Sequence, residues 1–184
     1  VEIYIMSSRL ELKLSACMLY VYSNLTLGNA KASERGLEII RECLRKEMEA
    51  PTSERNTAYC VFAGYMGTVL LHLSTEKLPD MKKYMSSLPQ GLRIFAANVI
   101  SHDLYLKGEY SRALGICDAA LFSCKEIYPV GMIYLYCVTA MCEISLKNQA
   151  EAEKAILTAW KLAVKDELIE PFIELHGLLQ GLLE

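Results

Sequence analysis

Hydrophobic residues recur along the chain at intervals of three and four, and this spacing predicts helices throughout. Uncharged stretches alternate with charged ones. Apolar helices with few charges are expected at about 9–27, 54–73 and 127–142, and charged helices follow at about 30–48 and 150–165. A short helix is expected before Pro89. No alternation of period two persists, so we predict an all-α fold without strands.

The clearest helix pair spans residues 95–124, where two apolar helical patterns flank the short segment Lys107–Gly108–Glu109. This segment predicts a tight turn, because glycine readily adopts the backbone conformations that turns require. Ala113 and Ala120 are small, so the second helix can approach the first closely. The pair is therefore expected to be antiparallel, with apolar surface left on both sides for neighbouring helices.

The other turns suggest that such pairs repeat. Leu27, Leu73, Leu106 and Leu146 stand at equivalent turn positions, roughly 30 to 50 residues apart, which is typical of helical repeats. We predict one helical-repeat domain over residues 1–184, with antiparallel pairs stacked into a right-handed superhelix. Its approximate repeats are 8–50, 52–89, 91–127 and 129–168, with a final helix at 171–184.

The central pair resembles a tetratricopeptide repeat. Gly108, Tyr110, Ala113 and Ala120 match that repeat's turn glycine, the aromatic residue after it and two small packing residues. Ala152 and Ala159 keep the spacing of the small residues in the next repeat. Ala97 stands where the usual first-helix tryptophan would be, so the array departs from the consensus.

A second resemblance concerns residues 150–184, about a fifth of the chain. This segment is similar to the end of the helical-repeat domain in large LuxR-type (maltose-regulon-activator-like) transcription regulators. The matching residues are Ala150, Ala152, Glu153, Ala159, Ala163, Pro171, Phe172, Leu178 and Leu179.

The second resemblance implies a bacterial signal-sensing and coupling domain that interacts with other domains of the same regulator. An ATPase or other sensor would precede this domain, and DNA would be bound only through a helix-turn-helix that follows Glu184. The chain contains neither part. The alternative is a general tetratricopeptide scaffold that binds a peptide or a partner protein, and a third hypothesis is an enzyme of unfamiliar type.

One stretch raises the question of a membrane. No Lys, Arg, Asp or Glu occurs between Arg55 and Glu76, and such a run is long enough to span a bilayer. Thr57, Tyr65 and His72 make it more polar than a typical membrane helix. We therefore expect a helix enclosed by protein and no membrane insertion.

The composition limits which partners and which cellular environment are expected for the protein. The 184 residues are 53% hydrophobic with a net charge of −3, which argues against electrostatic binding of nucleic acid. The seven cysteines contain no Cys-x-x-Cys pair and are expected to be buried thiols in a reducing, cytoplasmic environment.

No residue pattern indicates catalysis. The three histidines, His72, His102 and His176, have no second histidine at the spacing of a metal site, which needs three or four convergent ligands. No serine stands in a nucleophile motif, and no carboxylate pair stands in an apolar setting. We expect neither enzyme activity, nor a metal, nor a cofactor.

The repeat alignment does predict a ligand groove. In a tetratricopeptide array the first helix of each pair lines the concave surface, and the inward positions carry rings and hydrogen-bonding groups suited to a small-molecule or peptide effector. These positions are Tyr22, Tyr65, His72, Asn98, His102, Tyr105 and Tyr134. Alternatively, the same tyrosines face neighbouring helices.

The final helix predicts self-association. Its apolar residues have nothing after them in the sequence to cover them, so we expect a homodimer that buries this surface. The residues concerned are Phe172, Leu175, Leu179 and Leu182. In the preceding helix, Ile156, Ala159, Trp160 and Ala163 are expected to face inward.

Overall fold

The computed structural model describes residues 2–124 and 128–183, and the predicted boundaries at residues 1, 127 and 184 lie outside that range. Helices make up 78% of the structure, and the described residues include no strand, as predicted. The chain divides into two compact units, Val1–Pro89 and Gln90–Glu184. This division falls where the second predicted repeat gives way to the third.

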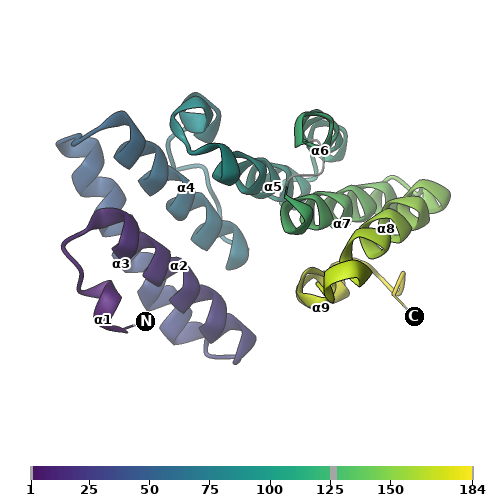
Figure 1. Cartoon of the computed structure of the whole chain (residues 1–184), viewed down its shortest axis with the longest axis horizontal. Helices are drawn as coiled ribbons and strands as arrows, with labels where there is room; N and C mark the ends of the chain where they lie inside the picture. Colours follow the sequence, from purple (N-terminus) through teal and green to yellow (C-terminus); the bar gives the residue numbers. More distant parts are fainter. Residues whose placement is uncertain (1, 125–127, 184) are drawn as a thin grey trace. The chain divides into compact units, whose positions relative to one another are not determined.

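The first unit consists of sequential antiparallel helices (Figure 1). Gly28 has a φ of +71° in the turn between the first two long helices, a conformation that glycine adopts without strain. The short helix predicted before Pro89 is a 3₁₀ helix. The elements are α1 (Glu2–Ile5), α2 (Leu10–Thr26), α3 (Ala30–Glu49), α4 (Glu54–Leu70) and η1 (Met81–Ser87).

After Arg55, helix α4 carries no charged residue, because protein surrounds it. It packs against α2, α3 and η1, and its residues 61–65 are all buried. Gly67 allows close approach to α3, since a Cβ there would lie 3.0 Å from Leu37 Cδ1. None of the helices in the described ranges has the length and apolar character needed to cross a membrane.

The second unit repeats this arrangement (Figure 1). Helix α7 contacts α5, α6, α8 and α9, and it supplies more buried hydrophobic residues than any other described helix of the unit. Gly108 has a φ of +75° in the predicted turn. The elements are α5 (Gln90–Leu106), α6 (Tyr110–Cys124), α7 (Pro129–Ser145), α8 (Gln149–Ala163), η2 (Val164–Asp166), α9 (Glu170–Leu175) and η3 (His176–Leu178).

The C-terminal segment corrects two expectations. The predicted helix over 171–184 ends as an α-helix at Leu175 and continues as a 3₁₀ turn, and the left-handed backbone of Gln180 and Gly181 is incompatible with a helix reaching residue 184. Phe172, Leu175 and Leu179 are buried against α7 and α8, and Leu182 is half-buried on the same core. The premise of an uncovered apolar face is therefore wrong, because the chain covers these residues itself.

The tryptophan on α8 also differs from prediction. Trp160 was expected to face inward, but 47% of its surface is exposed. Its ring packs edge-to-face on Phe172, with the ring centroids 5.5 Å apart. The small residues Ala152, Ala155 and Ala159 occupy the buried face of α8, which packs against α7.

Candidate functional site

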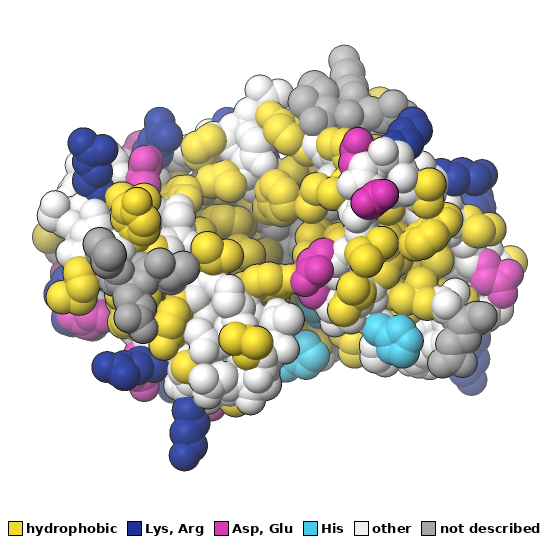
Figure 2. Space-filling model, turned by 60° about the horizontal axis from the view of Figure 1, so that its bottom comes forward, with side chains coloured by type: hydrophobic (Ala, Val, Ile, Leu, Met, Phe, Trp, Pro, Cys, Tyr) yellow, Lys and Arg dark blue, Asp and Glu magenta, His cyan; other side chains and the backbone are white. Residues whose placement is uncertain are grey.

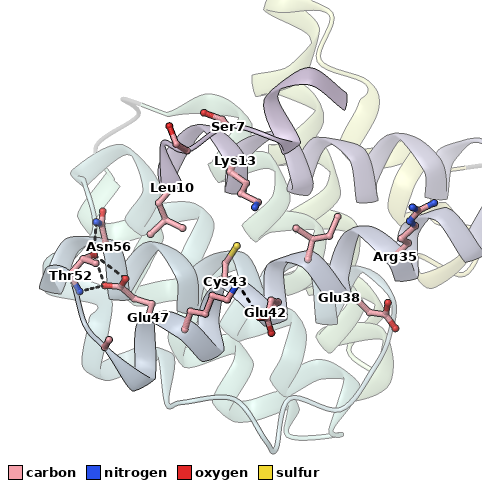
Figure 3. A pocket seen from close by; sticks show the side chains of 14 residues that line it. Ser7, Leu10, Lys13, Arg35, Glu38, Glu42, Cys43, Glu47, Thr52 and Asn56 are labelled. Atoms are coloured by element: carbon pink, nitrogen blue, oxygen red, sulfur yellow. Dashed lines mark hydrogen bonds and ion pairs between the residues drawn. The ribbon is translucent and has the colours of Figure 1, made fainter.

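The first unit has an open groove between α2 and α3 that is closed at one end by the start of α4 (Figure 3). Its volume is about 1060 Å³. All of the lining residues belong to the first unit: Ser7, Ser8, Leu10, Lys13, Arg35, Glu38, Ile39, Glu42, Cys43, Lys46, Glu47, Ala50, Thr52 and Asn56.

The groove has an apolar floor with charges of both signs along its sides. Leu10, Ile39 and Cys43 are half-buried in it. Lys13 extends from α2 toward Cys43 on α3, across the width of the groove (Figure 3). On the α3 side, the Lys46 ammonium lies 3.1 Å from a Glu42 carboxylate oxygen. A ligand here would meet cations and carboxylates close together.

Glu47 fixes the end of the groove. Its carboxylate accepts hydrogen bonds from the Thr52 backbone N–H at 2.8 Å and from the Thr52 hydroxyl at 2.9 Å. The Ser53 N–H at 3.4 Å and the Thr57 hydroxyl at 3.2 Å complete the set. Only 5% of Glu47 is exposed, so this carboxylate holds the α3–α4 connection in one conformation.

The charge on Glu47 persists despite its burial. Burial raises the pKa of this carboxyl, but the hydrogen bonds from Thr52, Ser53 and Thr57 together outweigh that effect and leave the pKa below its ordinary value. The side chain is therefore ionised near neutral pH. It is a fixed acceptor within the turn and has no proton to give to a ligand.

The thiol in the groove is not activated. Burial raises the pKa of Cys43, and the opposing effects of Lys13 and Lys46 are smaller. Because the thiolate is the nucleophilic form, Cys43 is a small apolar wall residue at neutral pH. The groove can thus bind a ligand through apolar contact and charge pairing, and its lining offers no nucleophile with an adjacent base.

The effector residues predicted in the first unit do not line this groove. Tyr22 is half-buried on α2, and Tyr65 is buried within α4. His72 is exposed just beyond the end of α4, with a left-handed φ of 52°. The alternative interpretation, in which tyrosines face neighbouring helices, describes Tyr65.

The second unit brings some of the predicted residues together. The ring of Tyr105 lies between His102 and Tyr110, with centroid distances of 6.2 Å and 5.6 Å. Asn98 is half-buried two turns earlier on the same helix. Tyr134 stands apart on α7, where its hydroxyl donates a 2.6 Å hydrogen bond to Glu174 of α9. His102 is buried, so these rings form a packed row between helices.

The groove was not predicted because residues 30–48 were described only as a charged helix, whose buried stripe is Leu37, Ile40 and Leu44. Ile39 and Cys43 form a second, shorter stripe one turn apart among the charges, and this was the available signal. No group of three or more histidine, cysteine or acidic side chains could hold a metal ion within the ranges described.

We compared the chain with protein-family models, with curated proteins and with solved structures, and found no match in any of the three.

Proposed function

We propose that this chain is a protein-interaction domain built from tetratricopeptide-like helix pairs, and that it couples signals within a LuxR-type transcription regulator. The manner of packing supports the repeat assignment. Helix α4 lies against both helices of the preceding pair, α2 and α3, and α7 lies in the same way against α5 and α6. Tetratricopeptide arrays are built by stacking such pairs. In this proposal the pairs continue into one right-handed superhelix.

The groove between α2 and α3 carries the proposal of an interaction function. It combines an apolar floor with paired charges of both signs and lacks an activated nucleophile. A peptide can satisfy such a surface, because its side chains alternate between apolar anchors and charged groups. We therefore assign the groove to a polypeptide segment of another domain or of a partner protein.

Exposed apolar surface on the second unit supports the same function. Hydrophobic side chains reach the molecular surface in the view of Figure 2. On α8 and the residues that follow it, five large hydrophobic side chains are between 47% and 60% exposed, and they are available to anchor a partner. They are Leu157, Trp160, Val164, Ile169 and Ile173.

Selection from a phage-displayed library of random peptides tests the groove. We expect residues 1–184 to enrich sequences of about a dozen residues that contain apolar anchors beside charges. Ile39→Asp and Lys13→Glu should each abolish retention, because one places a charge on the floor and the other reverses a charge at the rim. Leu19→Asp is the matched control and should retain the peptides, since Leu19 is an exposed hydrophobic residue of the same unit that does not line the groove.

Circular dichroism of each variant separates lost binding from lost folding. A selection that enriches nothing, or peptides that bind Ile39→Asp as well as the parent, would remove the groove from the proposal. If Leu157→Asp abolished peptide retention while the groove variants kept it, the interaction site would lie in the second unit.

The coding sequence distinguishes a regulator from a general scaffold. We expect it to continue past Glu184 into a helix-turn-helix within a few tens of residues, as the resemblance to LuxR-type regulators implies. Sequencing the transcript provides the measurement. A continuation with further helical repeats, or with any other domain, would leave the scaffold that binds a peptide or partner protein as the function.

A further inference from the structure

A second cavity in the first unit lies between α3 and the 71–80 segment, on residues distinct from the groove. Its volume is about 780 Å³. It is lined by Arg41, Leu44, Arg45, Met48, Thr68, Leu73, Ser74, Glu76, Lys77, Leu78 and Pro79. We propose that this cavity binds a small amphiphilic carboxylate, with its hydrocarbon chain inside and its carboxylate at the mouth. The inference does not depend on the proposed function.

The burial of the lining residues gives the cavity an apolar interior and a charged mouth. Leu44 is 6% exposed, and Leu78 and Pro79 are half-buried. Met48 and Leu73 are 43% and 41% exposed and form the walls nearer to solvent. The four charged lining residues are all exposed. A hydrocarbon chain would therefore gain free energy by leaving water for the interior, while a charged end group would stay at the rim.

The charges at the mouth favour an anion. Arg45 is already held by Glu42 and Glu49, at 2.8 Å and 2.7 Å, so its charge is balanced. Arg41 and Lys77 form no ion pair with the residues that the structure describes. Among the described lining residues, Glu76 is the only acidic one. Arg41 and Lys77 outnumber it, so the mouth carries an excess of positive charge. A carboxylate is the simplest group that this excess attracts.

Calorimetric titration of residues 1–184 with sodium octanoate tests the assignment, with 1-octanol and sodium acetate as probes that lack the charge or the chain. We expect saturable binding of octanoate, weaker binding of octanol and none of acetate. Arg41→Gln and Lys77→Gln should each weaken octanoate binding by about two- to five-fold and leave octanol unchanged. Glu76→Gln should strengthen octanoate binding by a similar factor.

Lys83→Gln is the matched control, because Lys83 is an exposed lysine of the same unit that does not line the cavity. Amide chemical shifts should change in α3 and the 71–80 segment. Absence of octanoate binding, equal affinity for octanoate and octanol, or equal weakening by Lys83→Gln would each overturn the proposal. So would tighter octanoate binding by Lys77→Gln. All four substitutions are on exposed side chains, so the variants should fold.

Discussion

Replacing Glu47 by alanine will lower the free energy of unfolding of the first unit by about 3 kcal/mol. The substitution removes a buried carboxylate that accepts from two backbone N–H groups and two hydroxyls at the α3–α4 connection. Hydrogen bonds to a charged group contribute more than neutral ones, and the donors left behind are partly buried. Denaturant unfolding followed by circular dichroism measures the change.

Glu42→Gln is the control for this experiment. Glu42 also lines the groove and pairs with Arg45 and Lys46, but it is solvent-exposed, so its loss should change stability little. Equal effects of the two substitutions would show that the buried network does not hold the turn. Glu47→Gln should fall between them, because the amide keeps one acceptor oxygen but loses the charge.

The ionisation of Glu47 should also make the stability of the first unit depend on pH. The folded-state pKa of Glu47 lies below its ordinary value of 4.5, so the unfolded state binds the proton more readily. Its stabilising contribution is complete above about pH 5 and is lost as pH falls through the folded-state pKa. Glu47→Gln has no such proton to bind. The stability of this variant should therefore fall less steeply than that of the parent below pH 5.

Most helix bounds before the C-terminal segment were accessible from sequence because they depend on local chemistry. Gly28 and Gly108 mark turns by their tolerance of positive φ, and both have it in the structure. The uncharged run between Arg55 and Glu76 predicted a helix enclosed by protein, which the packing of α4 confirms. Such features need only the chain's own periodicity and turn residues.

The candidate sites were less accessible because they depend on how helices rotate against one another. Whether Ile39 and Cys43 face solvent or α2 follows from the docking of α3, which the apolar stripe of Leu37, Ile40 and Leu44 fixes only to within part of a turn. The 71–80 segment forms its cavity by folding back over α3, and no periodic pattern encodes that path. Trp160 was misplaced because α8 buries its alanines instead.

The second large change in stability is expected where α5 packs closely against α7. Gly131→Ala will destabilise the second unit by about 1 to 3 kcal/mol, although alanine favours helices over glycine. A Cβ at this position would lie 2.8 Å, 2.9 Å and 3.0 Å from Cγ2, Cγ1 and Cδ1 of Ile94. Ile94 is buried and β-branched, so a rotamer change cannot clear all three atoms.

Gly115→Ala is the control that separates the steric clash with Ile94 from the intrinsic helix preference of alanine over glycine. Gly115 lies on the exposed side of α6, and a Cβ at this position would meet no atom within 4 Å, so alanine there should stabilise by about 0.5 to 1 kcal/mol. The two glycines should therefore give effects of opposite sign in thermal unfolding. In a double-mutant cycle, Ile94→Ala should cost less in the Gly131→Ala background than in the parent, because the added methyl then occupies vacated space. Additive costs would mean that α5 and α7 move apart without strain, and that Gly131 does not set their separation.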